Sequence, residues 1–113
     1  AHDVALSKQV CAKPMSRDCW SFDEVEAHWD QLVLRSFAIR GGVTRLYQEG
    51  SVSRLLHPRD LLLKIEGFEQ AHVIFGGTVP VEGPVCGADA FRVELQDPVL
   101  GRAIMCEYET IVL

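Results

Sequence analysis

The sequence is poor in the motifs that identify a reaction. It has no C-x-x-C pair, no H-x-x-x-H pair, and no glycine-rich loop that leads into a lysine or a helix. Zinc sites, metalloprotease helices and phosphate-binding loops depend on those spacings. We therefore expect no metal and no cofactor. The sequence identifies no catalytic residue, so it leaves open whether the protein is an enzyme.

Long apolar runs and clustered positive charge are also missing. No apolar stretch approaches the roughly 20 residues that a membrane-spanning helix needs, so we expect no membrane span. The formal net charge is −5, with 16 acidic and 11 basic residues. Nucleic-acid binding relies on clustered Lys and Arg that neutralise phosphates, so the acidic balance argues against a DNA or RNA partner.

The residues that are present fit one small globular domain. The 113 residues are 48% apolar and 24% charged, which is ordinary for a folded domain. Aromatic residues make up only 8%, so aliphatic side chains must do most of the packing. We predict a single α+β domain over residues 1–113, in which residues 1–20 form an arm held by a disulfide.

Four cysteines are the main clue to the compartment: Cys11, Cys19, Cys86 and Cys106. An even count in a chain that begins with Ala rather than Met favours an oxidising compartment. We therefore expect a secreted or periplasmic protein with Cys11–Cys19 and Cys86–Cys106 bridges. The alternatives are free buried thiols, which would indicate a cytoplasmic protein, and a metal site.

One helix is predicted from the spacing of apolar residues. Ser21 and Glu24 form an S-x-x-E capping box, which is typical of a helix start. Apolar residues then recur every three or four positions from Phe22 onward, and the Gly41-Gly42 pair is a typical helix stop. We predict one long amphipathic helix from Phe22 to Arg40.

After residue 42 the apolar period changes to two, which indicates strands. On the last predicted strand, Ile104, Cys106 and Tyr108 share one face. The fold class that follows is α+β, with one long amphipathic helix packed on an antiparallel sheet of about six strands. The predicted strands span residues 43–47 and 52–56, joined as a hairpin, then 61–66, 72–75, 90–96 and 102–112.

Positive charge is concentrated in the middle of the chain. Residues 40–64 carry five basic and two acidic residues, whereas residues 65–113 carry two basic and eight acidic. The predicted hairpin would place Arg45 and Arg54 on one face, and Arg59 precedes an aliphatic stretch. Guanidinium groups hold carboxylates and phosphates with paired hydrogen bonds. We take Arg45, Arg54 and Arg59 as candidate ligands for a small anion; alternatively, they pair with surface glutamates.

Two functions are compatible with these features. The first is a small binding or inhibitory module that contacts a protein partner through loops or a sheet edge. The alternative is a small enzyme or carrier that holds an anionic small molecule between helix and sheet. We favour the first, because no acid–base pair or nucleophile assembles from the sequence. A deep apolar pocket with an arginine and a titratable partner would favour the second.

Overall fold

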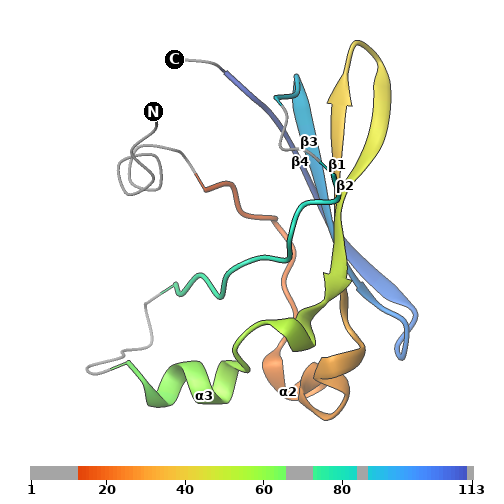
Figure 1. The fold of residues 1–113 in the computed structure, drawn as a ribbon. Coiled ribbons are helices and arrows are strands. Elements are labelled where there is room, and N and C mark those ends of the chain that lie inside the picture. Colours follow the sequence, from red (N-terminus) through yellow and green to blue (C-terminus); the bar gives the residue numbers. More distant parts are fainter. Residues whose placement is uncertain (1–12, 66–72, 84–86, 112–113) are drawn as a thin grey trace.

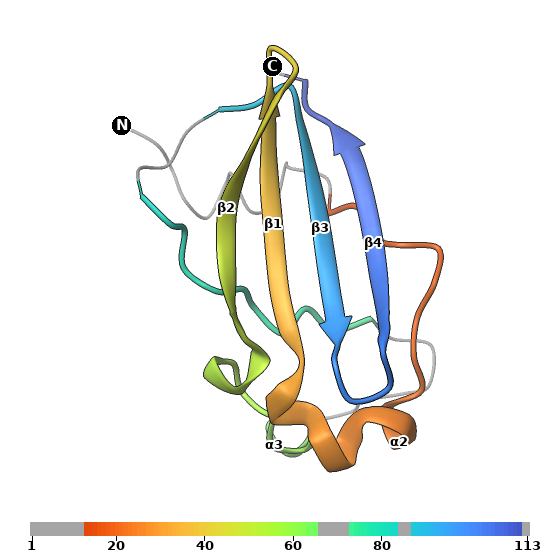
Figure 2. The same cartoon turned by 90° about the vertical axis from the view of Figure 1, so that its right-hand side faces the viewer.

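One antiparallel sheet forms the centre of the molecule in a computed structural model that describes residues 13–65, 73–83 and 87–111. The sheet has four strands in the order β2-β1-β3-β4 (Figures 1 and 2). The strands are β1 Val33–Arg40, β2 Val43–Ser51, β3 Ala90–Asp97 and β4 Arg102–Glu109. The central strands are therefore β1 and β3, and the edge strands are β2 and β4.

Short helical segments gather at one end of this sheet (Figure 2). The α-helix α2 (Phe22–Val25) continues directly into the 3-10 helix η1 (Glu26–Gln31). A second 3-10 helix, η2 (Val52–Arg54), follows β2, and the α-helix α3 (Pro58–Leu63) comes next. None of the helices in the described ranges has the length and apolar character needed to cross a membrane.

The predicted long helix from Phe22 to Arg40 is wrong, because the chain changes to a strand after Leu32. The helix begins at Phe22 as predicted, but the Ser21 side chain makes no capping hydrogen bond. Leu32 is already extended, with φ −68° and ψ 138°. The following residues pair with β2 on one side and β3 on the other. Pairing on both sides outweighs the helical spacing of the apolar residues.

The Gly41-Gly42 pair forms the hairpin turn between β1 and β2 rather than a helix stop. Both glycines have positive φ angles, 57° and 78°. A two-residue hairpin turn of this kind requires positive φ at both positions, which glycine adopts without steric cost. Glycine is therefore compatible with a helix stop and with a hairpin turn, and only the pairing of β1 with β2 distinguishes the two.

The predicted sheet of about six strands is also wrong, since the described residues form four. The hairpin of residues 43–47 with 52–56 is absent: β2 continues to Ser51 and pairs with β1. Residues predicted as a strand from 61 form part of α3, which has Pro58 in its first turn and His57 as its N-cap. Residues 73–75 form no strand, and residues 66 and 72 lie outside the described residues.

The antiparallel pair at the C-terminal end is confirmed. The strand predicted at 90–96 corresponds to β3. The strand predicted at 102–112 corresponds to β4, which ends at Glu109 and so covers its first eight residues. Partial burial alternates along β4 with a period of two. Ile104, Cys106 and Tyr108 lie on one face as predicted, opposite Leu95, Val93 and Phe91 of β3 in the register.

The two faces of the sheet differ in polarity. We call the face that carries Val93, Leu95, Ile104, Cys106 and Tyr108 the inner face. The opposite, outer face carries ion pairs: Arg35 of β1 pairs with Glu49 of β2, and Arg92 lies 3.1 Å from Glu94 along β3. An antiparallel sheet with one packed face and one solvated face shows this pattern.

A small core joins the helical segments to the end of the inner face. Val25, Leu32 and Val52 are buried together. The amide of Val52 donates to the Leu32 carbonyl at 3.1 Å, so η2 is tied to the start of β1. The partly buried apolar residues packed against this core are Trp20, Phe22, Trp29, Leu34 and Leu95.

The free edge of β2 is covered by residues 78–82. Val79 is almost fully buried, and a Cβ at Gly50 would lie only 3.0 Å from the Val79 side chain. The Gln48 side chain donates to the Val79 carbonyl at 2.7 Å, and the Glu82 amide donates to the Tyr47 carbonyl at 2.7 Å. Glycine at position 50 is therefore what allows this close approach.

Replacing Leu32 with Ala should strongly destabilise the fold. Leu32 has no exposed surface, and truncating a buried leucine costs about 2–5 kcal/mol. Leu63, which is 85% exposed in α3, is the matched control, and Leu63→Ala should change stability by less than about 0.5 kcal/mol. Urea unfolding of both variants measures the difference. Equal losses of stability would contradict the position of Leu32 in the core.

Candidate functional site

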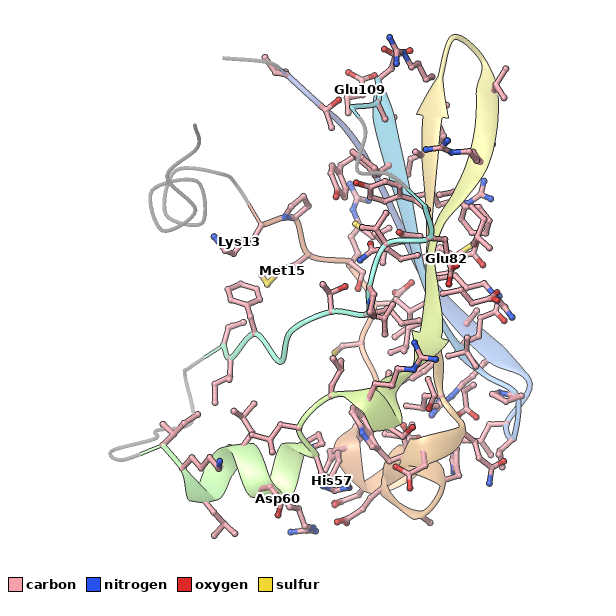
Figure 3. The ribbon with its side chains drawn as sticks, in the orientation of Figure 1. Lys13, Met15, His57, Asp60, Glu82 and Glu109 are labelled. Atoms are coloured by element: carbon pink, nitrogen blue, oxygen red, sulfur yellow. The ribbon has the colours of Figure 1, made fainter. Side chains whose placement is uncertain are left out.

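An apolar cavity of about 440 Å³ lies between residues 14–20 and the inner face of the sheet. The segment 14–20 runs beside the inner face toward α2 (Figure 1), and Figure 3 places Lys13 and Met15 at its outer end, away from the sheet. The sheet forms the floor of the cavity and α2 with η1 closes one end. Its lining residues are Pro14, Ser16, Asp18, Cys19, Trp20, Phe22, Val25, Trp29, Leu32, Val93, Leu95, Ile104, Cys106 and Tyr108.

Aromatic rings form the end wall of the cavity. The Phe22 and Trp29 ring centroids are 5.8 Å apart in an edge-to-face arrangement, which is a favourable geometry for aromatic pairs. The His57 ring packs against both, with centroids 6.0 Å away. The Trp29 indole Nε1 is buried and donates to no acceptor among the described residues. This wall therefore acts through packing rather than through a hydrogen bond of Trp29.

The polar groups of the lining come from segment 14–20 and from β4. The Ser16 hydroxyl donates to the Asp18 carbonyl at 2.5 Å, which shapes the segment locally. Burial raises the pKa of Tyr108, and the neighbouring Cys106 raises it further. The Tyr108 phenol is therefore neutral at pH 7. Asp18 is the one residue of the described lining that carries a formal charge at neutral pH.

The cysteines that the structure describes are not bridged. Cys19 is exposed and Cys106 is half-buried, and both carry free thiols. The partners predicted for them, Cys11 and Cys86, lie outside the described residues. The structure therefore gives no support to the predicted bridges, and it does not indicate the compartment that was argued from them.

Arg59, one of the three candidate anion ligands, is already engaged on the outside of the helical segments. Its guanidinium makes two hydrogen bonds to Glu26, with Nη2 2.6 Å from Oε1, and its Cζ lies 5.5 Å from the Phe22 ring centroid. The hydrogen bond from Arg59 lowers the pKa of Glu26, and the same bond raises the pKa of Arg59. Arg59 thus supports the outer side of an aromatic residue that lines the cavity.

The other two candidate arginines lie far apart. Arg45 is on β2 opposite Ala38, whereas Arg54 is in η2 beyond the other end of that strand. Ser51 lies six positions beyond Arg45 along β2, which corresponds to about 20 Å. Arg45 instead lines a separate hollow of about 270 Å³ together with Arg40. The structure therefore does not bring Arg45, Arg54 and Arg59 into one site, and none of them lines the apolar cavity.

A buried carboxylate anchors the helical segments to the turn between β3 and β4. His28 Nε2 lies 2.9 Å from Asp97 Oδ2, and the amides of Val99 and Leu100 donate to Oδ1 at 3.0 and 3.1 Å. Burial by itself would raise the pKa of Asp97. The hydrogen bonds from His28 and from the two amides outweigh it, so the pKa lies below its ordinary value.

Arg102 connects this anchor to the cavity wall. Its Nε lies 3.4 Å from Asp97, and its guanidinium carbon lies 4.4 Å from the centroid of the Trp20 ring. Glu24, which the sequence placed in a capping box, instead lies 3.6 Å from the Arg102 guanidinium. Arg102 thus joins the buried Asp97 to an aromatic ring that lines the cavity.

Basic side chains are absent from the described lining. The described lining contains no histidine, lysine or arginine, so neither free thiol has a basic side chain beside it there. Within the described ranges, no three His, Cys, Asp or Glu residues come together as metal ligands. An aromatic and aliphatic lining with a few polar groups is typical of small-molecule binding sites.

Sequence reasoning did not identify this site. Trp20, Phe22 and Trp29 were interpreted as the start of a long helix face, and Asp18 was not a candidate. One signal was available, since three of the nine aromatic residues of the chain fall between positions 20 and 29. The alternation of Ile104, Cys106 and Tyr108 predicted the floor, but nothing in the sequence showed what would face it.

The comparisons with known proteins give a family but no activity. The family model described as "Protein of unknown function (DUF2848)" matches residues 1–108, so the chain belongs to the DUF2848 family. No curated protein and no solved structure matches it.

Replacing Asp97 with Asn should destabilise the protein at neutral pH by about 1–3 kcal/mol, because the buried partners lose a charged acceptor. A carboxylate whose pKa is lowered on folding contributes stability above its unfolded pKa of about 3.9, and this is lost as the pH falls through the folded value. The difference between wild type and Asp97→Asn should therefore shrink below about pH 4.

Urea unfolding at pH 7 and in acid measures this difference. The exposed residue Asp30 is the matched control, and Asp30→Asn should have little effect at either pH. A difference between wild type and Asp97→Asn that stays constant from pH 7 to pH 3 would contradict the proposed role of the ionised carboxylate.

Proposed function

We propose that this chain is a binding module that holds a small aromatic molecule in the cavity between segment 14–20 and the inner face of the sheet. The observation that carries the proposal is the cavity itself. Its volume of about 440 Å³ lies within the usual range of small-molecule sites, and aromatic and aliphatic side chains dominate its lining. Part of its wall is the loop 14–20, in keeping with a binding module that acts through loops.

The expected affinity follows from the apolar area that such a ligand would bury. A ring system burying about 150–250 Å² gains roughly 4–6 kcal/mol from removal of apolar surface from water. Association then costs part of this through lost translational and rotational freedom. A minimal ligand with two fused rings should therefore bind weakly, with a Kd on the order of 1–10 mM.

A carrier of anionic molecules has less support from the structure. That function was expected to place Arg45, Arg54 or Arg59 against the ligand. All three lie outside the described lining of the cavity, and Arg59 is bound to Glu26. An enzyme that uses acid–base chemistry also has less support, because the described lining offers no histidine.

The two tryptophans of the chain give a direct test of binding. Both Trp20 and Trp29 line the cavity, and the chain has no other tryptophan. We expect 1-naphthalenemethanol, a neutral probe, to shift both indole N–H signals in ¹H–¹⁵N spectra, with one common Kd. Shifts confined to backbone signals of the outer face would contradict the proposed site.

Filling the cavity from its floor should weaken that binding. Ile104→Phe adds volume on the inner face of β4, and we expect the Kd of 1-naphthalenemethanol to rise about tenfold. The matched control is the next residue, Met105, which is 63% exposed on the outer face. Met105→Phe should leave the Kd unchanged. An equal effect of the two substitutions, or none from Ile104→Phe, would contradict the proposed function.

A further inference from the structure

We propose that the cavity selects a cationic ligand, a small aromatic or alkyl group that carries an ammonium. This inference rests on the proposed function and adds the charge of the ligand. It is carried by three features of the described lining: a single formal charge, which is negative, several aromatic rings, and no cationic side chain.

The charge of the lining comes from Asp18 alone. The remaining lining residues are apolar or uncharged at neutral pH, and Lys and Arg are absent from the described lining. An ammonium group in a largely apolar cavity needs a partner of opposite charge, because desolvation of an unpaired ion is costly. The Asp18 carboxylate, on the exposed segment 14–20, meets that need at the rim of the cavity.

Aromatic rings supply the second attraction. Trp20, Phe22, Trp29 and Tyr108 all line the cavity. The face of an aromatic ring carries negative electrostatic potential, and it attracts ammonium groups most strongly where water is excluded. Groups of such rings are the usual recognition site for alkylated ammonium ions. A neutral apolar ligand gains nothing from this electrostatic attraction, so the rings select a ligand by its charge as well as by its shape.

Two arginines lie against the wall of the cavity and carry the opposite charge to Asp18. Arg59 stacks on Phe22 and Arg102 stacks on Trp20, so positive charge lies close to two lining rings. Each is matched by carboxylates, however. Glu26 binds Arg59 with two hydrogen bonds.

Arg102 is matched in the same way, because Asp97 and Glu24 lie 3.4 and 3.6 Å from its guanidinium. The two guanidiniums therefore leave little net positive charge around the wall, and they do not cancel the effect of Asp18.

An anionic ligand is the opposite expectation, and the positions of the charges argue against it. An anion in the cavity would meet the Asp18 carboxylate and the negative ring faces. The separate hollow lined by Arg40 and Arg45 is better suited to an anion, and it shares no residue with the cavity. An anion and a cation would thus bind at different places on this chain.

The test compares three naphthalene probes that differ mainly in charge. At pH 7, 1-naphthylmethylamine is a cation, 1-naphthalenemethanol is neutral and 1-naphthoate is an anion. The two tryptophan indole signals report binding of each probe in the cavity. We expect the amine to bind roughly tenfold more tightly than the alcohol, and the naphthoate to bind most weakly at this site.

Asp18→Asn should remove most of the preference, so that the amine and the alcohol bind with similar Kd. The matched control is Asp60→Asn on α3, an exposed carboxylate away from the cavity lining (Figure 3), which should leave the preference intact. Equal Kd values of amine and alcohol in wild type, or tighter binding of naphthoate, would overturn the inference while the binding function stands.

A preference that survives Asp18→Asn unchanged would also overturn the role of Asp18 in the inference. Failure of all three probes to shift either indole signal would instead overturn the proposed function itself. The two failures are distinguished by the neutral alcohol, which tests binding without any contribution from charge.

Discussion

Burial of Leu32 at the junction between η1 and β1 is the constraint on which the rest of the site depends. This residue ends the helical segment, and its backbone carbonyl accepts a hydrogen bond from the amide of Val52. Because the side chain is fully buried with Val25 and Val52, the helical segments cannot tilt away from the end of the sheet without exposing the core. The aromatic wall is thereby held over the inner face.

Polar contacts also hold that wall. Asp97 is a buried carboxylate that satisfies two amides of the β3–β4 turn and also contacts His28 and Arg102. Arg102 carries the connection on to Trp20. A buried charge of this kind is costly unless its partners are complete, so the cluster favours one arrangement of η1 relative to the turn. Apolar packing and a polar anchor thus fix the same wall independently.

The sequence predicted local features well and long-range pairing poorly. The strands β3 and β4, the shared face of Ile104 and Cys106, and the helix start at Phe22 follow from alternation and from turn residues close in sequence. The long helix failed because apolar residues at 33, 34 and 37 fit a helical period, while the partners that make β1 a strand lie up to about 60 residues away. The expected proximity of Arg45 and Arg54 was wrong for the same reason, since it assumed a hairpin that the pairing of β1 with β2 replaces.

The distribution of charge shows why the site could not be predicted from the net charge of the chain or of a long stretch of it. The net charge of −5 and the basic stretch at residues 40–64 are sums over many residues that lie far apart in the structure. Exposed charges separated by more than about 8 Å are largely screened from one another at physiological salt. What a bound molecule meets is decided by the few groups around it. Arg59 and Arg102, although close to the wall, are matched by carboxylates, and Arg45 lies elsewhere on the sheet. Asp18 has no special pattern in the sequence, yet the path of segment 14–20 makes it the charge that lines the cavity.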